Sequence, residues 1–527
     1  MAYYKDLREF IQVLEKSGNL RRIKREINKD FELQPLFRWQ FRGLPENERK
    51  AFLFENVTDV KGRKYDIPVL IGAHAASTEI YAKSMMCQPN QIPAKWEEAQ
   101  LHPIKPRIVE SGPVQEEVHM GDTLLEHGGM DEFPVPISTP GFDVAPYITA
   151  GNSVSKDPET GTYNIGNYRI MVKSQSRLGI SAVIPAHLRR NRDLYKERGV
   201  PMPVAVVIGP APNIGLVSVT SLPYEVDEYD VAGGIAGEPV ELVKCKTVDL
   251  EVPATAEIVI EGEVSIDYLE KEAPFGEYCG YIGLRKQKPV LNITAITHRR
   301  RPIFNAFLCQ FPPSESSTLR GIGCDAAYYK FLRYDLSLQN VVDVAFHRES
   351  GAWQFCVISL RNPSKTDVWR ALYGASAFDP QLAKIIVAVD DDVNPRHADS
   401  ILWALCFRMR PDHDIRIVPH KTASLDYSAV PMPEIEARVD RPPTAGLLID
   451  ATRDWPYPPV SLPKKEFMER ARQIWEEEGL PPLTPKVPWY GYSLGYWPEE
   501  YEQEAELALK GEHYKTGEKL EKTRIKG

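Results

Sequence analysis

The sequence lacks the cysteine pattern of a disulfide framework and of a thiolate metal site. Its seven cysteines are an odd number, lie scattered along 527 residues and never occur in C-x-x-C spacing. A disulfide scaffold needs paired cysteines in a small secreted domain, and thiolate zinc sites use closely spaced ones. Neither class of protein is indicated.

The sequence also lacks a long apolar run and a strong charge of one sign. Its N-terminal residues MAYYKDLREF contain no apolar signal core, and no uninterrupted apolar stretch approaches a membrane span. The formal net charge of -9 is small for this length. It gives no reason to expect nucleic acid or an acidic membrane as a partner. We therefore expect a cytoplasmic protein without either partner.

The residues that are present predict a large globular chain of roughly three domains. Apolar residues at helical spacing predict an opening helix that ends at Gly18, within an N-terminal α/β domain over residues 1–115. Closely spaced strands separated by Gly, Pro and Asn predict a barrel over 116–325. Alternating apolar runs and helical patterns over 326–500 predict βαβ units with a parallel sheet. A charged tail occupies 501–527.

The stretch EAPFGEYCGY holds two carboxylates, Glu272 and Glu277, around Pro274 and Gly276. A helix would separate them by about 140° of rotation, and the Pro and Gly make a helix unfavourable. A Pro-Phe-Gly turn would instead aim both carboxylates into one pocket, where like charges separate their pKa values into an acid and a base. The alternative is a solvated surface loop.

Three other side chains form a hard to borderline ligand set. Asn164 lies in KDPETGTYNIGNYRIMV with Arg169, His187 follows in SAVIPAHLRR, and Glu241 lies in EYDVAGGIAGEPVELVKC. Amide, carboxylate and imidazole ligands suit an octahedral Mn²⁺ or Mg²⁺ that also takes phosphate or water oxygens. Unrelated surface and core roles are the alternative, because the sequence alone does not bring the three together.

Two charged stretches have simpler interpretations. Asp390, Asp391 and Asp392 could bind a hard cation, but we favour acidic residues at the N-terminus of a following helix. HRRRP at 298–302 could bind a phosphate, but between two strand-like runs we favour a charged hairpin.

Longer stretches resemble a known family in order along nearly the whole chain. DVAPYITAG, KDPETGTYNIGNYR, EPVELVKC, EVPATAEIVIEGE, EAPFGEYCGYIG, LWALCFRMRPDHDI and LLIDAT are similar to motifs of the UbiD family of prenylated-flavin-dependent decarboxylases. The resemblance implies a multidomain α+β and α/β fold. A central split β-barrel would bind the flavin between an N-terminal α/β segment and a C-terminal α/β oligomerisation domain.

The resemblance also implies roles for single residues. Arg169, Glu272 and Glu277 would form the catalytic network, with Glu272 held ionised by Arg169 and Glu277 as the proton donor. Asn164, His187 and Glu241 would bind a metal that joins the cofactor phosphate to the protein, with Mn²⁺ the first choice, Mg²⁺ or Fe²⁺ the alternatives and K⁺ a further ion. The cofactor-binding residues implied are Asn164, Ile165, Asn167, Tyr168, Arg169, Ile184, Pro185, Ala186, His187 and Glu241.

The implied chemistry is the reversible, non-oxidative decarboxylation of an aromatic or α,β-unsaturated acid. Loss of CO₂ from such a carbon leaves an sp² carbanion that side chains cannot delocalise, so a cofactor must supply the electron sink. The family uses prenylated FMN, supplied by a UbiX-type flavin prenyltransferase. Hydroxybenzoates, acrylic acids, heteroaromatic acids and aryl thioesters such as phthaloyl-CoA are the candidate substrates, and a homodimer or homohexamer is expected.

The sequence departs from the family pattern at two positions, and other functions remain as alternatives to decarboxylation. Gly446 stands in TAGLLIDAT where relatives commonly carry a cofactor-contacting Lys, and Ala273 stands where Gly is commoner. The rivals are the carboxylase direction, a non-catalytic subunit of a carboxylase complex, and a flavin-dependent oxidoreductase. An oxidoreductase would not need the Arg169 network, and a non-catalytic subunit should lose part of either set of residues. Both sets are complete, which favours an enzyme.

Overall fold

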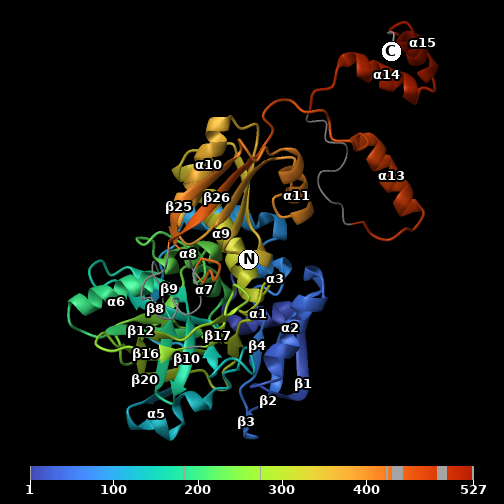
Figure 1. Cartoon of the computed structure of the whole chain (residues 1–527). Coiled ribbons are helices and arrows are strands. Elements are labelled where there is room, and N and C mark those ends of the chain that lie inside the picture. The colour runs from blue at the N-terminus through green and yellow to red at the C-terminus, as the bar shows by residue number, and fades with distance from the viewer. Residues whose placement is uncertain are drawn as a thin grey trace.

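The chain forms an N-terminal α/β region, a central curled sheet and a C-terminal α/β region, which follow one another in Figure 1 from blue through green to orange. The computed structural model describes residues 2–181, 186–272, 274–422, 425–429, 443–483 and 495–524. This confirms the predicted mixed α/β multidomain fold, and the domain boundaries stay predictions. Within the described ranges, no helix has both the length and the apolar character needed to cross a membrane.

The N-terminal region is a sheet covered by helices. Its helices are α1 (Leu7–Lys16), α2 (Leu33–Gly43), α3 (Thr78–Ser84) and α4 (Ile92–Leu101), and its strands are β1 (Leu20–Asn28), β2 (Ala51–Thr58), β3 (Lys64–Tyr65), β4 (Val69–Ile71) and β21 (Phe304–Ala306). The predicted opening helix is α1, which Asp6 caps and which buries one apolar face. The main strands lie in the order β1-β2-β4-β21, so this sheet takes its last strand from beyond the central region.

The central region is one curled sheet in the order β7-β10-β11-β20-β15-β12-β8-β9, with β6 added to β20. The strands are β6 (Glu117–Met120), β7 (Tyr147–Ile148), β8 (Gly151–Lys156), β9 (Tyr163–Asn167), β10 (Arg169–Ser174), β11 (Arg177–Ser181), β12 (Met202–Ile208), β15 (Ile258–Val264) and β20 (Val290–His298). The helices are α5 (Asp122–Glu126), α6 (His187–Glu197), α7 (Pro212–Val217) and α8 (Glu228–Ala236). Two short strand pairs, β16 (Glu270–Glu272) with β19 (Lys286–Lys288) and β17 (Phe275–Gly276) with β18 (Ile282–Gly283), project from the sheet.

The C-terminal region has the predicted parallel strands at its centre. The strand order is β22-β23-β24-β26-β25, and β23, β24 and β26 run parallel while both edge strands are antiparallel. Its strands are β22 (Val341–Phe346), β23 (Phe355–Leu360), β24 (Ile385–Asp390), β25 (Ile415–Thr422) and β26 (Pro443–Ala451), and its helices are α9 (Glu315–Lys330), α10 (Lys365–Phe378) and α11 (Ala398–Phe407).

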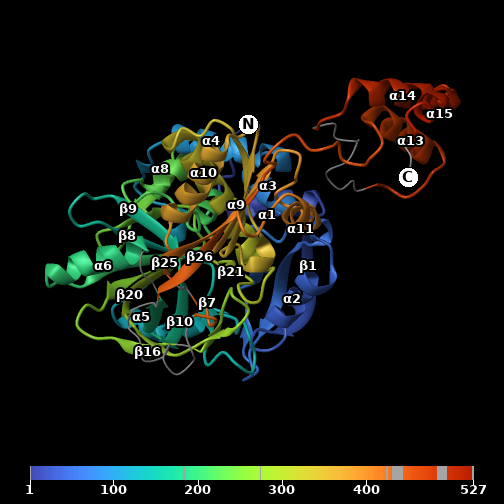
Figure 2. The same ribbon diagram turned by 45° about the horizontal axis from the view of Figure 1, so that its top comes forward.

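The last helices extend away from the rest of the molecule. Figures 1 and 2 show α13 (Lys465–Glu477), α14 (Glu499–Leu509) and α15 (His513–Glu521) beyond the C-terminal sheet. None of these helices has a buried residue, although Phe467, Ile474 and Leu509 are large and apolar.

Two predictions for charged stretches are wrong. HRRRP forms no hairpin, because β20 before it and β21 after it belong to different sheets. The aspartates after β24 do not cap α11, which begins only at Ala398. Instead, Arg408 donates to both carboxylate oxygens of Asp392 at 2.6 Å and to Asp390 at 2.9 Å, with all three side chains buried. Asp390 and Asp392 therefore compensate a buried guanidinium.

Asp392→Asn should destabilise the C-terminal region by about 3–5 kcal/mol, because it leaves the buried Arg408 with less compensating charge. Asp391→Asn is the matched control, since Asp391 pairs with the largely exposed Arg361 and the change should cost less than about 1 kcal/mol. Thermal unfolding of the two variants and the wild type measures both effects. Equal losses in the two variants would contradict this account.

Candidate functional site

Arg169 joins the two glutamates of the EAPFGEYCGY stretch. Arg169 begins β10 and Glu272 ends β16. The guanidinium donates from Nε to Oε1 of Glu272 at 3.0 Å and from Nη2 to Oε2 at 2.7 Å, while Nη1 forms an ion pair with Glu277. The structure thus brings the three predicted catalytic residues together. The predicted Pro-Phe-Gly turn is wrong, because Phe275 and Gly276 form β17 and the chain reverses only after Glu277.

The two carboxylates have different surroundings. The side chain of Glu272 is fully buried and both of its oxygens accept from Arg169, whereas that of Glu277 is 11% exposed. The ring of Phe275 lies 5.6 Å from the guanidinium carbon. Burial lowers the pKa of the neighbouring Lys173, although Glu272 opposes this shift. Glu272 is therefore fixed as the partner of Arg169, and Glu277 is the carboxylate with solvent access.

The C-terminal region contacts the strand pair that carries Glu277. The hydroxyl of Tyr427 donates to the carbonyl of Ile282 on β18 at 3.1 Å, and its ring meets that of Tyr281 edge-on. The position of Glu277 is therefore linked to that of the C-terminal region.

A second cluster forms where two helices begin beside β9. His187 is the first residue of α6 and Glu228 the first of α8. The Nδ1 atom of His187 lies 3.7 Å from Oε1 of Glu228, and Oε2 of Glu228 accepts from the backbone N–H of Ile165 at 3.2 Å. Next to Ile165, the buried Asn164 lies within reach of Ser155. Burial raises the pKa of Glu228 in spite of the nearby His187.

Glu241, the predicted third metal ligand, lies elsewhere. It begins β13 (Glu241–Lys244), in a separate sheet with β14 (Glu251–Pro253) and β5 (Arg107–Ile108), and forms an ion pair with Arg107 at the surface. Glu228 is the carboxylate beside His187, and the prediction missed it although it lies in the same quoted stretch. The available signal was its place after Asp227, whose side chain caps α8. An acidic residue there begins a helix and can point back at the sheet.

The remaining predicted cofactor residues lie on β9, just after it or before α6. Ile165 is buried, Asn167 donates its backbone N–H to Ser218, and Ala186 precedes α6. A Cβ atom on Gly166 would lie 2.3 Å from the hydroxyl of Tyr168, so only glycine lets that side chain lie across the strand. Burial raises the pKa of Tyr168 to about 12. Ile184, Pro185 and Ala273 lie outside the described residues.

A lysine packs against Gly446, the position at which the resemblance implies a lysine in relatives. Gly446 lies on β26, and a Cβ atom there would come within 3.3 Å of Cγ of Lys421 on β25. The Lys421 ammonium donates to the carbonyls of Ser376 and Asp379. Burial lowers the pKa of Lys421 to about 8.

The curled central sheet flanked by two α/β regions, matched by family models over most of the chain, defines a carboxy-lyase of the UbiD class. Models of the N-terminal, Rift-related and C-terminal domains of 3-octaprenyl-4-hydroxybenzoate carboxy-lyase match residues 11–100, 107–312 and 317–451. The chain belongs to the UbiD family.

Relatives match over nearly their whole length. An uncharacterized protein of Aquifex aeolicus is 32% identical over 515 residues, which cover 91% of this chain and 100% of the relative. The UbiD-class enzyme HmfF from Pelotomaculum thermopropionicum, solved in complex with FMN, is 30% identical with a TM-score of 0.75 and covers 89% of this chain and 99% of its own. An evolved dimeric form of HmfF was solved with prFMN. Vanillic acid decarboxylase of Sedimentibacter hydroxybenzoicus in closed form is 26% identical with a TM-score of 0.77, over 90% of this chain and 100% of its own.

Proposed function

We propose that this protein decarboxylates an aromatic or α,β-unsaturated carboxylic acid with bound prenylated FMN. The observation that supports the proposal is the geometry around Arg169. Its guanidinium donates two hydrogen bonds to the buried Glu272 and forms an ion pair with the more exposed Glu277 through its third nitrogen. HmfF, which shares the fold at 30% identity, was solved with FMN and, in its evolved form, with prFMN. The prenylated flavin supplies, when bound, the electron sink that loss of CO₂ from an sp² carbon requires.

Three residues of this chain would orient the substrate and supply the proton. Arg169 orients the substrate carboxylate by charge-assisted hydrogen bonds, and Glu272 holds the guanidinium in place. Glu277 has solvent access and delivers a proton to the carbon that has lost CO₂. The low exposure of all three side chains strengthens these interactions, because little water screens them. In the carboxylase direction the same residues act in reverse, with Glu277 accepting the proton.

We further propose that Asn164, His187 and Glu228 hold the metal, with Glu228 in place of Glu241. Amide oxygen, imidazole nitrogen and carboxylate oxygen fit a hard to borderline divalent cation, with Mn²⁺ the first choice. The His187 and Glu228 atoms that face each other are 3.7 Å apart, beyond hydrogen-bond distance, so the donor set fits a shared cation. The metal would neutralise Glu228 and anchor the flavin phosphate.

Replacing Glu228 and Glu241 separately tests the metal assignment. Glu228→Gln should lower Mn²⁺ affinity at least tenfold and reduce bound flavin with it, because it removes the only anionic member of the set. Glu241→Gln is the matched control and should keep both. Metal analysis and flavin absorbance of the purified proteins measure the outcome. Full Mn²⁺ occupancy in Glu228→Gln, or its loss in Glu241→Gln, would make Glu228 the wrong residue.

Replacing the two catalytic glutamates tests the reaction. The protein is first co-expressed with a flavin prenyltransferase so that it carries the cofactor. Its substrate is then identified by measuring CO₂ release from vanillate, other hydroxybenzoates, acrylic acids, heteroaromatic acids and phthaloyl-CoA. Glu277→Gln keeps size and hydrogen bonding but cannot donate a proton, so turnover should fall on the order of 10²- to 10⁴-fold. Glu272→Gln removes the carboxylate that fixes Arg169, so substrate binding should weaken as well.

Solvent deuterium separates the two roles. The wild type in D₂O should place one deuteron on the carbon that lost CO₂, and Glu277→Gln should do so slowly. If Glu277→Gln turns over and incorporates deuterium at the wild-type rate, another group donates the proton. Consumption of a nicotinamide cofactor without CO₂ release would favour the oxidoreductase alternative.

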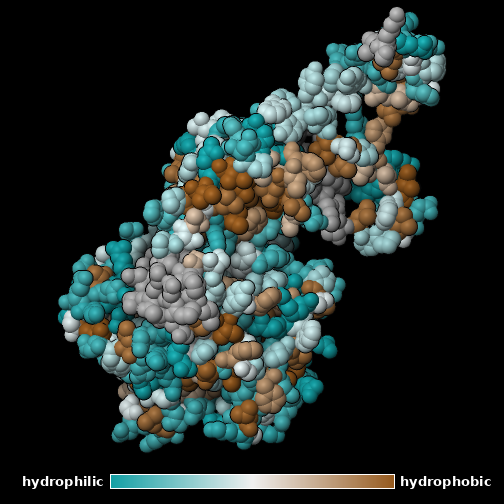
Figure 3. Space-filling model, viewed as in Figure 1, coloured by the Kyte–Doolittle hydropathy of each residue, from teal (hydrophilic) through white to brown (hydrophobic). Residues whose placement is uncertain are grey.

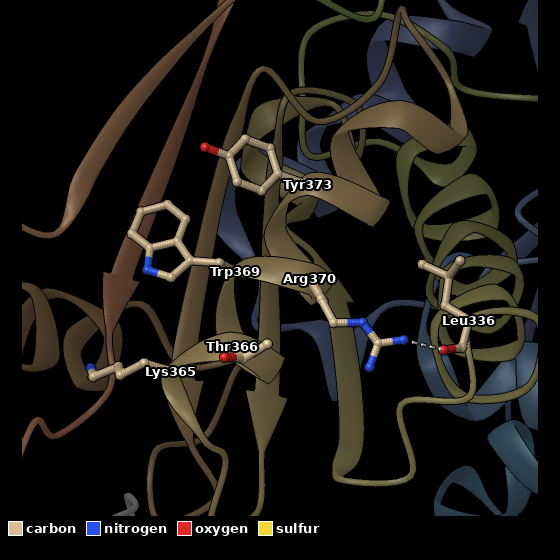
Figure 4. Close-up of a pocket in the computed structure, with 6 residues that line it drawn as sticks. All are labelled: Leu336, Lys365, Thr366, Trp369, Arg370 and Tyr373. Carbon is tan, nitrogen blue, oxygen red and sulfur yellow. Dashed lines mark hydrogen bonds between the residues drawn. The ribbon is translucent and has the colours of Figure 1, made fainter.

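We also propose that the protein is a homo-oligomer held together by its C-terminal region. A hydrophobic patch lies over the C-terminal sheet in Figure 3, where Ile417 on β25 is 73% exposed. An open hollow of about 640 Å³ lies beside α10, lined by Leu336, Lys365, Thr366, Trp369, Arg370 and Tyr373 (Figure 4). None of the apolar side chains on the extended α13 is buried against the part of the chain that the structure describes. A second copy is the partner that covers both kinds of surface.

Light scattering measures the assembly. The full chain should have at least twice the monomer mass of 59.6 kDa at micromolar concentration. The double variant Phe467→Asp, Ile474→Asp should shift the protein towards the monomer, whereas Arg472→Glu should not, because Arg472 lies on the opposite face of α13. A wild-type mass near that of one chain would contradict the proposed assembly.

A further inference from the structure

Two histidines and a glutamate converge on the opposite side of the central region from α8. His119 lies on β6, His298 ends β20, and Glu132 ends the short helix η4 (Gly129–Glu132). In both Figures 1 and 2, α5, which joins β6 to η4, lies well away from α8, where Glu228 is found. The cluster is therefore separate from the site proposed for the flavin metal.

The sheet register brings the two histidines to one face. His119 pairs with Ile296, two residues from His298 on the same strand. Diagonal neighbours of this kind project to the same side of a sheet and lie within reach of each other. Packing also orients both rings, because His127 stacks on His119 at 3.8 Å between ring centroids and Phe133 meets His298 edge-on.

The spacing of the ligand atoms is that of a coordination sphere. Nδ1 of His119 lies 3.2 Å from Oε2 of Glu132, and Nε2 of His298 lies 3.3 Å from Oε1. One ligand atom from each of the three residues can be chosen so that all lie within 4.8 Å of one another. Bonds of about 2.0–2.1 Å to a tetrahedral Zn²⁺ place neighbouring ligand atoms about 3.3 Å apart.

The hydrogen bonding around the cluster leaves its facing ligand atoms without partners. Nδ1 of His298 lies 2.8 Å from the carbonyl of Arg299, so that nitrogen carries the proton and Nε2 presents its lone pair. Nδ1 of His119, Oε2 of Glu132 and Nε2 of His298 are all buried and have no well-formed hydrogen bond. Buried polar atoms without partners are costly, and a bound cation would satisfy all three.

The backbone holds Glu132 in this position. Gly129 has a φ of +54°, and a Cβ atom there would lie 2.2 Å from the carbonyl oxygen of Gln175. The next residue, Met130, donates its N–H to that same carbonyl at 2.9 Å. The helix that carries Glu132 is thus fixed against the turn after β10, and the carboxylate does not depend on a loose loop.

We propose that His119, Glu132 and His298 form a second divalent-metal site, for Zn²⁺, that fastens β6 and η4 to β20. Two imidazoles and one carboxylate are a zinc donor set. Both histidines are nearly fully buried, whereas the Glu132 side chain is 21% exposed and leaves an opening for a solvent ligand. The ion stabilises the end of the central sheet, so its removal lowers stability.

Zinc binding to the full chain tests the site. The protein is stripped with a chelator, loaded with Zn²⁺, freed of excess metal by gel filtration and assayed for zinc per chain. Glu132→Gln, which keeps the shape of the side chain, and His298→Ala should each lose one equivalent. His127→Gln is the matched control, because His127 lies against His119 but is not a ligand, and it should keep that equivalent. His187→Ala should also keep it, because it affects only the other cluster.

A second measurement covers variants that fold poorly. Co²⁺ added to the stripped His187→Ala protein should give the intense visible absorption of a four-coordinate ion, and Zn²⁺ should displace it and raise the thermal midpoint. If Glu132→Gln binds as much zinc as the wild type, or if His187→Ala retains no zinc and gives no such Co²⁺ absorption, the proposal is wrong. The three side chains would then be a metal-free, charge-paired cluster.

Discussion

The ion pairing of Arg169 with Glu272 and Glu277 is the interaction on which the central region depends. Two carboxylates this close would repel each other, and the guanidinium between them offsets one negative charge. The guanidinium interacts differently with the two carboxylates. The fully buried Glu272 accepts two hydrogen bonds from Arg169, whereas the side chain of Glu277 is partly exposed to solvent. One charged network thus holds one fully buried carboxylate and one that is partly exposed to solvent.

This network draws together parts of the chain that lie far apart in sequence. Arg169 comes from the curled sheet, Glu272 ends β16 and Glu277 directly follows β17. Tyr427 of the C-terminal region contacts β18, the partner strand of β17. Strand β10 follows directly after β9, which holds Asn164. The proposed metal cluster and the Arg169 cluster are therefore joined by one short backbone segment, which would relate the position of an anchored flavin to that of the proposed catalytic residues.

One buried charge of the C-terminal region is compensated in the same way. Arg408 is matched by Asp390 and Asp392, and the sequence shows only three acidic residues in a row. The His119, Glu132 and His298 cluster differs, because its facing atoms have no well-formed hydrogen bonds. That difference separates a structural ion pair from a set of side chains suited to a metal.

The sequence by itself determined the fold class, the family and which residues share a continuous motif, although it misjudged the local turn at Pro274–Gly276. Asn164 and Arg169 fall in a single motif, and Glu272 and Glu277 in another, so their proximity followed from local spacing and resemblance. Only the tertiary structure decided which glutamate accompanies His187. Glu228 and Glu241 stand in the same stretch, but α8 begins against β9 and β13 turns Glu241 to the surface beside Arg107. Likewise, His119 and His298 are 179 positions apart by their numbers, and only the register of β6 on β20 brings them together. Such contacts depend on how separate elements pair and pack, and local periodicity carries no information about that pairing.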